Sequence, residues 1–334
     1  MKLEQTVLGR YGERGLYFSL MNKNTVAGIQ WDARKMCLEI RQKSELCIKS
    51  KNWCSLREAR LRTVTRMVQA IGDLPAMPRI AAEIMEKLSN PSVLPRDIHN
   101  LIVKDQVLAA RVLKVANSPY YGAARSISTL KDAILFMGLD SVKSVVFAAV
   151  LMGVFTEMGL AETLLWEHSI GCAIVAKKLA TVCGYLNNEE AFLAGLLHDL
   201  GKVVLFQCVP DKMNAVMQEV YNSDVDFAAA EMRALGFTHA EVGQLLADKW
   251  YFTLNMESAI ANHHHPEESK TAVAFCHIVC LANAFCHKLE IGPTRRPNID
   301  LSAHDSAKAL RLTPDQVSEL FEELKNTMST GEGI

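Results

Sequence analysis

The sequence has almost no excess of charge of either sign. Its 36 lysines and arginines are matched by 37 aspartates and glutamates, so the formal net charge is −1. Proteins that bind DNA or RNA through the phosphate backbone usually carry a basic excess or a basic patch. We therefore expect no direct binding to nucleic acid.

The nine cysteines include no CxxC pair, a spacing typical of many zinc and redox sites. They are scattered through the chain, mostly in apolar, helix-like sequence, at Cys37, Cys47, Cys54, Cys172, Cys183, Cys208, Cys276, Cys280 and Cys286. This distribution is typical of free, buried thiols in a reducing compartment. A metal knot within 276–287 is the alternative, built from Cys276, Cys280, Cys286, His277 and His287. The spacing there is that of a helix interior, which favours the first interpretation.

The sequence also lacks a membrane signal by simple inspection. We find no apolar run of the ~18 residues that a spanning helix needs. The first residues lack the charged and then apolar pattern of a signal peptide. We therefore expect a cytoplasmic protein without a membrane partner.

What the sequence does contain is helical periodicity. From Leu56 onward apolar residues recur at helical spacing, and no strand-like alternation appears over 56–155. The predicted fold is all-α, with a front bundle at 56–155, a second bundle at 156–290 and a C-terminal helical extension at 291–334. Residues 1–55 form an uncharacterised N-terminal extension, for which a small appended unit and a flexible leader fit equally well.

Several local signals mark helix ends. Thr238 with Glu241 and Thr313 with Gln316 have the spacing of capping boxes. Pro78 suits the first turn of a helix. The segment Asn117–Gly122 should end one helix and form an ordered wedge, because Pro119 and Gly122 oppose continuation and the tyrosines can pack sideways.

The stretch Ala191–Leu205 reads as one buried helix interrupted by three ionisable residues, His198, Asp199 and Lys202. Such groups are costly in an apolar environment unless they are paired with an opposite charge, bound to a ligand or in contact with water. One interpretation is a His-Asp dyad that serves a metal or anion site, and the other is a polar network that fixes helix packing. Gly195 and Gly201 would let another helix backbone come close.

Further histidines follow the same chain order. His168 lies on the apolar stripe of a helix over 162–183 and should face the core. His239 opens a helix and, taken alone, is predicted at the surface. His263 and His264 flank the buried stripe of the helix after Asn255. Neutral imidazoles are good ligands for borderline divalent metals. The candidate cofactor is a divalent ion of iron, manganese or zinc.

This order of histidine, His-Asp, histidine and paired histidines resembles the HD superfamily of metal-dependent phosphohydrolases. The segments LPAMPRIAAEIMEKLSNP, DQVLAARVLKVANSPYYG, STLKDAILFMGLDSVKSVV and AGLLHDLGK resemble more closely its HD-related output domain (HDOD) branch, over about Leu56 to Leu289. The resemblance implies an HD-like bundle at 156–290. It also implies candidate metal ligands at His168, His198, Asp199, His239, His263 and His264, and Lys202 as the lysine of the HDxGK pattern.

Two departures from the superfamily pattern bear on activity. Asn283 stands where the pattern has a closing aspartate, which leaves a weak seventh ligand position without charge. The sequence after the paired histidines is His265-Pro266-Glu267-Glu268-Ser269, without the GYP loop of the related cyclic-dinucleotide phosphodiesterases. The resemblance therefore implies a non-catalytic signalling domain that binds protein partners, with a nucleotide or metal as an additional ligand. The alternative is a metal-dependent phosphohydrolase with Lys202 in a catalytic role.

Overall fold

The computed structural model describes residues 53–72, 74, 82–83, 86, 92–117, 121, 123, 126–153, 160–185, 187–223 and 225–329. Within these ranges all regular structure is helical, and no strand occurs. The all-α prediction is confirmed. The predictions for residues 1–52, for a helix from Pro78 and for most of the wedge around Pro119 lie outside the described residues.

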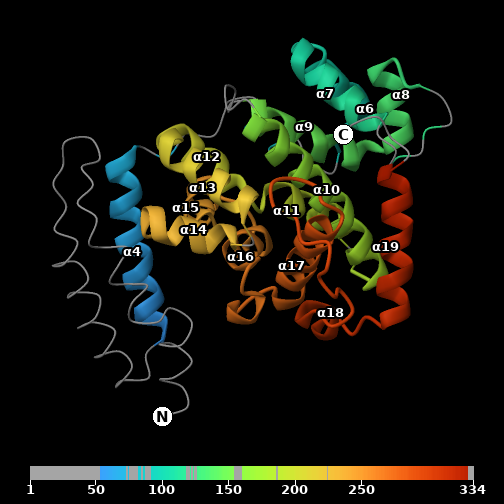
Figure 1. Ribbon diagram of the computed structural model, residues 1–334. Helices are drawn as coiled ribbons and strands as arrows, with labels where there is room; N and C mark the ends of the chain where they lie inside the picture. The colour runs from blue at the N-terminus through green and yellow to red at the C-terminus, as the bar shows by residue number, and fades with distance from the viewer. Residues whose placement is uncertain are drawn as a thin grey trace.

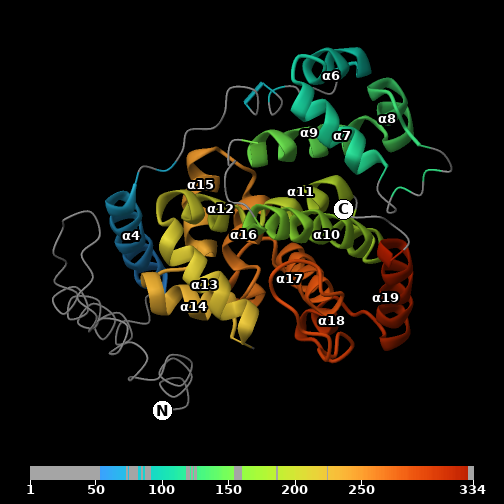
Figure 2. The same cartoon turned by 45° about the horizontal axis from the view of Figure 1, so that its top comes forward.

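Four helices, the α6–α9 layer, cover one side of the molecule (Figure 2). They are α6 (Pro95–Ile102), α7 (Gln106–Ala116), α8 (Leu130–Met137) and α9 (Leu139–Gly153). The apolar face of α7, formed by Leu108, Val112 and Val115, is buried. At the end of α7, Asn117 accepts from Ile127 N at 2.7 Å and donates to Ile127 O at 2.8 Å. This pair of bonds fastens the start of the connection to α8.

The second group of helices builds the remainder of the core. It runs through α10 (Leu160–Val182), α11 (Asn188–Leu197), α12 (Leu200–Cys208), α13 (Pro210–Asn222), α14 (Phe227–Leu235), α15 (His239–Lys249), α16 (Leu254–Asn262), a 3-10 turn (Pro266–Glu268) and α17 (Val273–Lys288). α10 packs against both α11 and α17. A Cβ on Gly195 would lie 2.5 Å from Cys172 O, so this glycine permits the close approach of α11 to α10, as predicted.

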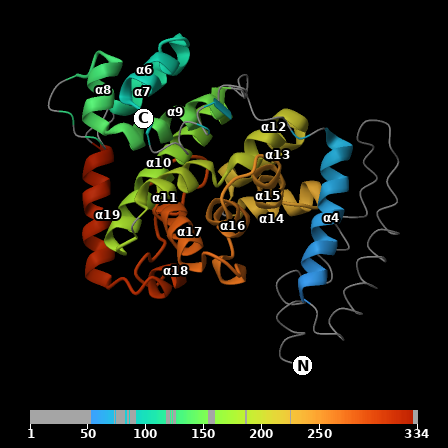
Figure 3. The ribbon, with the colours of Figure 1, turned by 180° about the vertical axis from the view of Figure 1, so that it is seen from behind.

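The first and last described helices flank this group on opposite sides (Figures 1 and 3). α4 (Trp53–Ile71) packs against α15, where Arg60 Nε lies 2.6 Å from Glu241 Oε1. After α18 (Asp305–Ala309), α19 (Pro314–Ser329) contacts α10 and α17 through side chains. Its Glu323 lies 2.6 Å from Lys178, and its Phe321 ring contacts Phe285 at 6.2 Å between centroids. The division into domains at 55, 155 and 290 stays a prediction.

Both predicted capping boxes are present. Glu241 N donates to Thr238 Oγ1 at 3.4 Å, and Thr238 N donates to Glu241 Oε2 at 2.9 Å. Gln316 N likewise donates to Thr313 Oγ1 at 3.2 Å, with Thr313 N donating to Gln316 Oε1 at 2.9 Å. Each box satisfies two backbone donors that a helix start leaves without partners.

The prediction of one continuous helix over Ala191–Leu205 is wrong. α11 ends at Leu197 and α12 begins at Leu200, with His198 and Asp199 in the turn between them. α12 approaches α15 closely, since a Cβ on Gly201 would lie only 2.0 Å from His239 O. The break turns two adjacent polar side chains toward one buried point, which a continuous helix would have spread around its axis.

The same stretch contradicts the expectation that no apolar run is long enough to span a membrane. By length and composition Asn188–Cys208 could cross a membrane, with a mean hydropathy of 1.3, but 83% of its apolar window is buried inside the protein. A core helix of a globular fold has the same composition, since it is surrounded by apolar side chains. The burial accounts for the apolar character of this stretch.

Candidate metal centre

Asp199 lies at the centre of a buried group of histidines. Its Oδ2 lies 3.5 Å from His198 Nε2, 3.6 Å from His168 Nε2 and 2.6 Å from Lys202 Nζ. On the other side its Oδ1 lies 3.1 Å from His239 Nε2 and 3.7 Å from His263 Nε2. The carboxylate therefore connects two sets of imidazoles, one through each oxygen.

The second set is itself tightly grouped. His239 Nε2 lies 3.2 Å from His263 Nε2 and 3.0 Å from His264 Nε2. The structure thus brings together all six side chains that the resemblance selected as ligands, from the helix α10, the turn after α11, the start of α15 and the end of α16. Among the six, only His264 is more than 3% exposed.

His239 is fully buried, at 0% exposure, so the surface position that its local sequence suggests is wrong. Its place in the first turn of α15 is as predicted. His239 is buried because α12 contacts α15 at Gly201. This contact packs the first turn of α15 against the turn that carries Asp199.

Three of the histidines are oriented by backbone carbonyls. Nδ1 donates to Gly195 O at 2.7 Å in His198, to Ile260 O at 2.9 Å in His263 and to Ile291 O at 3.1 Å in His168. A carbonyl oxygen can only accept, so Nδ1 carries the proton in each neutral ring. Each Nε2 then presents a lone pair toward the centre, which is the form of imidazole that binds a metal.

Glu231 orients the fourth ring and was missed by the sequence analysis. It lies on α14 and is 0% exposed. Its Oε2 accepts from His239 Nδ1 at 2.6 Å and from His239 N at 2.8 Å. A carboxylate behind a histidine is a common partner in metal sites. The only sequence signal was an acidic residue within the apolar run FAAAEMRAL, eight residues before His239.

The other two predicted site residues, Lys202 and Asn283, make different contacts from the six ligand candidates. Lys202 Nζ is paired with Asp199 and lies 4.2 Å from the centroid of the Phe227 ring, so its charge is already neutralised by the carboxylate and by the aromatic face. Asn283 lies on α17 at 8% exposure, and its Oδ1 has no hydrogen-bond partner. Asn283 makes no hydrogen bond with the six ligand candidates.

The electrostatics keep four of the six ligand candidates, named below, in metal-binding form. Burial lowers the pKa of His168 to about 3 and also lowers the pKa of His198 and, strongly, that of His263. Burial by itself would raise the pKa of Asp199, but the surrounding histidines and Lys202 hold it well below its usual range. Near neutral pH these rings are neutral and the carboxylate is charged.

The stability of the metal-free protein is expected to fall on acidification below about pH 6.5. The unfolded chain then protonates His168, whereas the folded chain does so only near its lowered pKa of about 3. The titration of His168 alone should lower the free energy of unfolding by about 2 kcal/mol between pH 7 and pH 5. His239, whose pKa is raised by Glu231 and Asp199 against the effect of burial, acts in the opposite sense. Guanidinium unfolding midpoints at the two pH values measure the change.

Two variants make this measurement specific. His168→Gln should reduce the pH dependence, because the buried titrating ring is removed. His265→Gln is the matched control, because the side chain of His265 is 45% exposed and lies outside the buried group. Equal midpoints at pH 7 and 5 in the natural chain would contradict the burial of neutral histidines.

The family is decided by comparison with known proteins. A sequence model of the HDOD domain matches residues 74–266, more than half of the chain. This chain belongs to the HDOD family. An HDOD domain protein of Geobacter sulfurreducens shares 30% sequence identity, with a TM-score of 0.70 over 82% of this chain and 98% of that chain. The predicted family is therefore confirmed.

Other HDOD-like structures support the fold alone. A candidate phosphohydrolase of Shewanella amazonensis is 22% identical, with a TM-score of 0.60 over 78% of this chain and 97% of its own. A candidate signal transduction protein of Marinobacter aquaeolei is also 22% identical, with a TM-score of 0.67 over 81% of this chain and 64% of its own. Proteins with this fold are thus named both as phosphohydrolases and as signal transduction proteins.

The curated relative is longer than this HDOD protein. An uncharacterised protein of Treponema pallidum (strain Nichols) is 25% identical over 209 residues, which make up 61% of this chain and 41% of the relative. The chain therefore spans about two fifths of the length of that relative.

Proposed function

We propose that this HDOD protein is a non-catalytic regulatory domain of a signalling pathway that acts through protein partners and holds a divalent metal in the six-residue centre. The observation that carries the proposal is the enclosure of that centre. His168, His198, Asp199, His239 and His263 are each at most 3% exposed. A phosphodiester would have to reach ligands that the fold keeps away from solvent.

The donor set fits a metal of the iron, manganese or zinc class. Imidazole suits iron and zinc, and the one carboxylate, a ligand that also suits manganese, supplies the negative charge. His198 Nε2 is buried without a hydrogen-bond partner, which is costly unless a ligand uses it. His168, His198 and Asp199 would hold an ion on one side, and His239, His263 and His264 on the other. A metal there would polarise a phosphoryl oxygen or acidify a bound water.

Two features argue against turnover. Asn283 replaces the closing carboxylate of the superfamily pattern, so Asp199 is the only acidic member of the donor set. The Lys202 ammonium lies 2.6 Å from Asp199 Oδ2 and competes with any cation for that oxygen.

A metal-dependent phosphohydrolase is the second candidate, favoured by the convergence of five imidazoles, and Lys202 would then stabilise charge on the substrate. A bound nucleotide, a cytoplasmic location and the lack of a membrane or nucleic-acid partner belong to the same proposal.

Metal analysis of protein purified without chelator tests the proposed metal binding. We expect a divalent metal in the natural chain and a 10–100-fold lower affinity in Glu231→Gln, because that variant weakens the orientation of His239. Glu219→Gln is the matched control, since Glu219 pairs with Arg233 at about half exposure, away from the centre. Equal affinities in the two variants, or no metal in the natural chain, would contradict the proposed centre.

An activity assay tests the proposed lack of catalysis. The natural chain, Asn283→Asp and Asp199→Ala are assayed with cyclic dinucleotides and generic phosphodiesters in added manganese, iron(II) or zinc. We expect no turnover by the natural chain. Turnover that depends on metal and disappears in Asp199→Ala would establish the phosphohydrolase instead. Turnover only in Asn283→Asp would support a site that lacks one carboxylate.

A further inference from the structure

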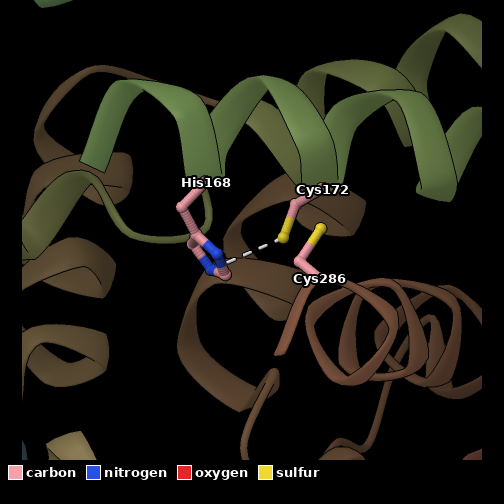
Figure 4. Close-up of side chains that lie close together, drawn as sticks. All are labelled: His168, Cys172 and Cys286. Atoms are coloured by element: carbon pink, nitrogen blue, oxygen red, sulfur yellow. Dashed lines mark hydrogen bonds between the residues drawn. The ribbon is translucent and has the colours of Figure 1, made fainter. Parts of the chain in front are cut away.

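Two thiols lie directly beside the candidate centre. Cys172 follows His168 by one helical turn on α10, so both side chains lie on the same face. Cys286 reaches the same point from α17, as Figure 4 shows. Cys172 Sγ lies 3.5 Å from His168 Nε2, and the ligand atoms of His168, Cys172 and Cys286 lie within 4.8 Å of one another. The cysteine-histidine knot considered within 276–287 is not the group that the described residues form.

The group is enclosed and its approach is built into the packing. His168 is 2% exposed, and Cys172 and Cys286 are 0% exposed. A Cβ on Gly171 would lie 3.1 Å from Cys286 Sγ, so a glycine at this position lets the thiol of α17 come close to α10. A Cβ on Gly292 would lie 2.6 Å from His168 Cβ, where the loop after α17 covers the ring. The three donors are therefore held by two packed helices and one close loop.

We propose that His168, Cys172 and Cys286 form a second site, which binds a zinc-like divalent cation through two thiolates and one imidazole. Zinc and cobalt accept this donor set, whereas magnesium, calcium and manganese prefer oxygen. Two thiolates also neutralise the charge of a divalent cation, which matters in a buried environment where net charge is costly. On binding, each thiol loses one proton to solvent and forms one metal–sulfur bond.

His168 is the residue that the two sites share. Its Nδ1 donates to Ile291 O, so the single lone pair at Nε2 can bind an ion in only one of the two sites at a time. That nitrogen lies 3.5 Å from Cys172 Sγ and 3.6 Å from Asp199 Oδ2, between sulfur on one side and a carboxylate on the other. Three protein donors leave one coordination position, for which Asp199 Oδ2 is close at hand. The sulfur site therefore favours soft or borderline cations at this end of the centre.

Cobalt(II) titration of the full chain under a non-thiol reductant tests the site, because a thiolate ligand produces a sulfur-to-cobalt charge-transfer absorption in the near ultraviolet. We expect this band in the natural chain and its loss in Cys172→Ala and in Cys286→Ala. The band should persist in Cys280→Ser, which changes another thiol of α17, and in Glu231→Gln, which weakens only the histidine centre. Cobalt binding without the band, no cobalt binding, or a band that survives Cys286→Ala would overturn the proposal.

X-ray absorption at the zinc edge of the natural, zinc-loaded chain gives a second measurement that does not depend on whether any variant folds. Two sulfur ligands are expected on a bound zinc, and a zinc environment of nitrogen and oxygen alone would overturn the sulfur site. That second result would leave the histidine centre intact, so the two proposals fail separately.

Discussion

Replacement of Asp199 by alanine is expected to destabilise the metal-free protein by about 3–5 kcal/mol, because it leaves the buried Lys202 ammonium without its partner. In the natural chain these groups lie 2.6 Å apart, with side-chain exposures of 6% for Lys202 and 3% for Asp199. The free energy of unfolding in urea, measured on chelator-treated protein at neutral pH, gives the change.

Two further variants separate the charge effect from simple truncation. Asp199→Ala combined with Lys202→Met should recover a large part of the lost stability, since the unpaired charge is then removed as well. Glu323→Ala breaks the pair with Lys178, but that carboxylate is 51% exposed and the loss should stay within about 1 kcal/mol. A cost for Asp199→Ala as small as that for Glu323→Ala would mean that Asp199 is accessible to water.

The second large effect is expected for Gly201→Ala. The added Cβ would lie 2.0 Å from His239 O and 2.8 Å from Gly243 N, both of them backbone atoms of α15. Side chains cannot relieve this overlap by changing rotamer, so α12 must move away from α15. We expect a loss of at least about 3 kcal/mol, the upper end of overpacking costs, despite the better helix propensity of alanine. Thermal or urea unfolding measures it.

Gly243→Ala is the matched control on the opposite helix. Its Cβ would meet a side-chain atom, Ile260 Cγ2, at 2.7 Å, and it lies 3.6 Å from the nearest backbone atom of Gly201. Because the isoleucine can shift, the expected cost is about 1 kcal/mol. Metal affinity should fall in Gly201→Ala, which separates Asp199 from His239, and stay nearly unchanged in Gly243→Ala. Similar small effects of both substitutions would contradict the backbone contact between α12 and α15.

Much of the helical framework was predictable from the sequence because the relevant interactions are local. The apolar face of α7 follows from the spacing of Leu108, Val112 and Val115. The starts of α15 and α19 follow from capping residues three positions apart. The identity of the six ligand candidates came from their order along the chain, which matched a family pattern and required no knowledge of distances.

Other features of the site were decided by tertiary packing. The break at His198 and Asp199 occurs inside a run whose composition favours one helix, so the surrounding helices, and not local propensity, set its position. Glu231 reaches His239 from a different helix, and nothing in its own neighbourhood predicts this partner. The local sequence of His239 placed it at the surface, and only the glycine contact between α12 and α15 buries it.

Cys172 and Cys286 show the same division most clearly. The apolar sequence around these thiols predicted that they are buried, and neither belongs to a CxxC pair. They are separated by more than a hundred residues along the chain. Helical periodicity determines which face of its own helix a residue occupies, and it carries no information about which face of another helix lies opposite. The packing of α10 on α17 alone places the two sulfurs beside His168.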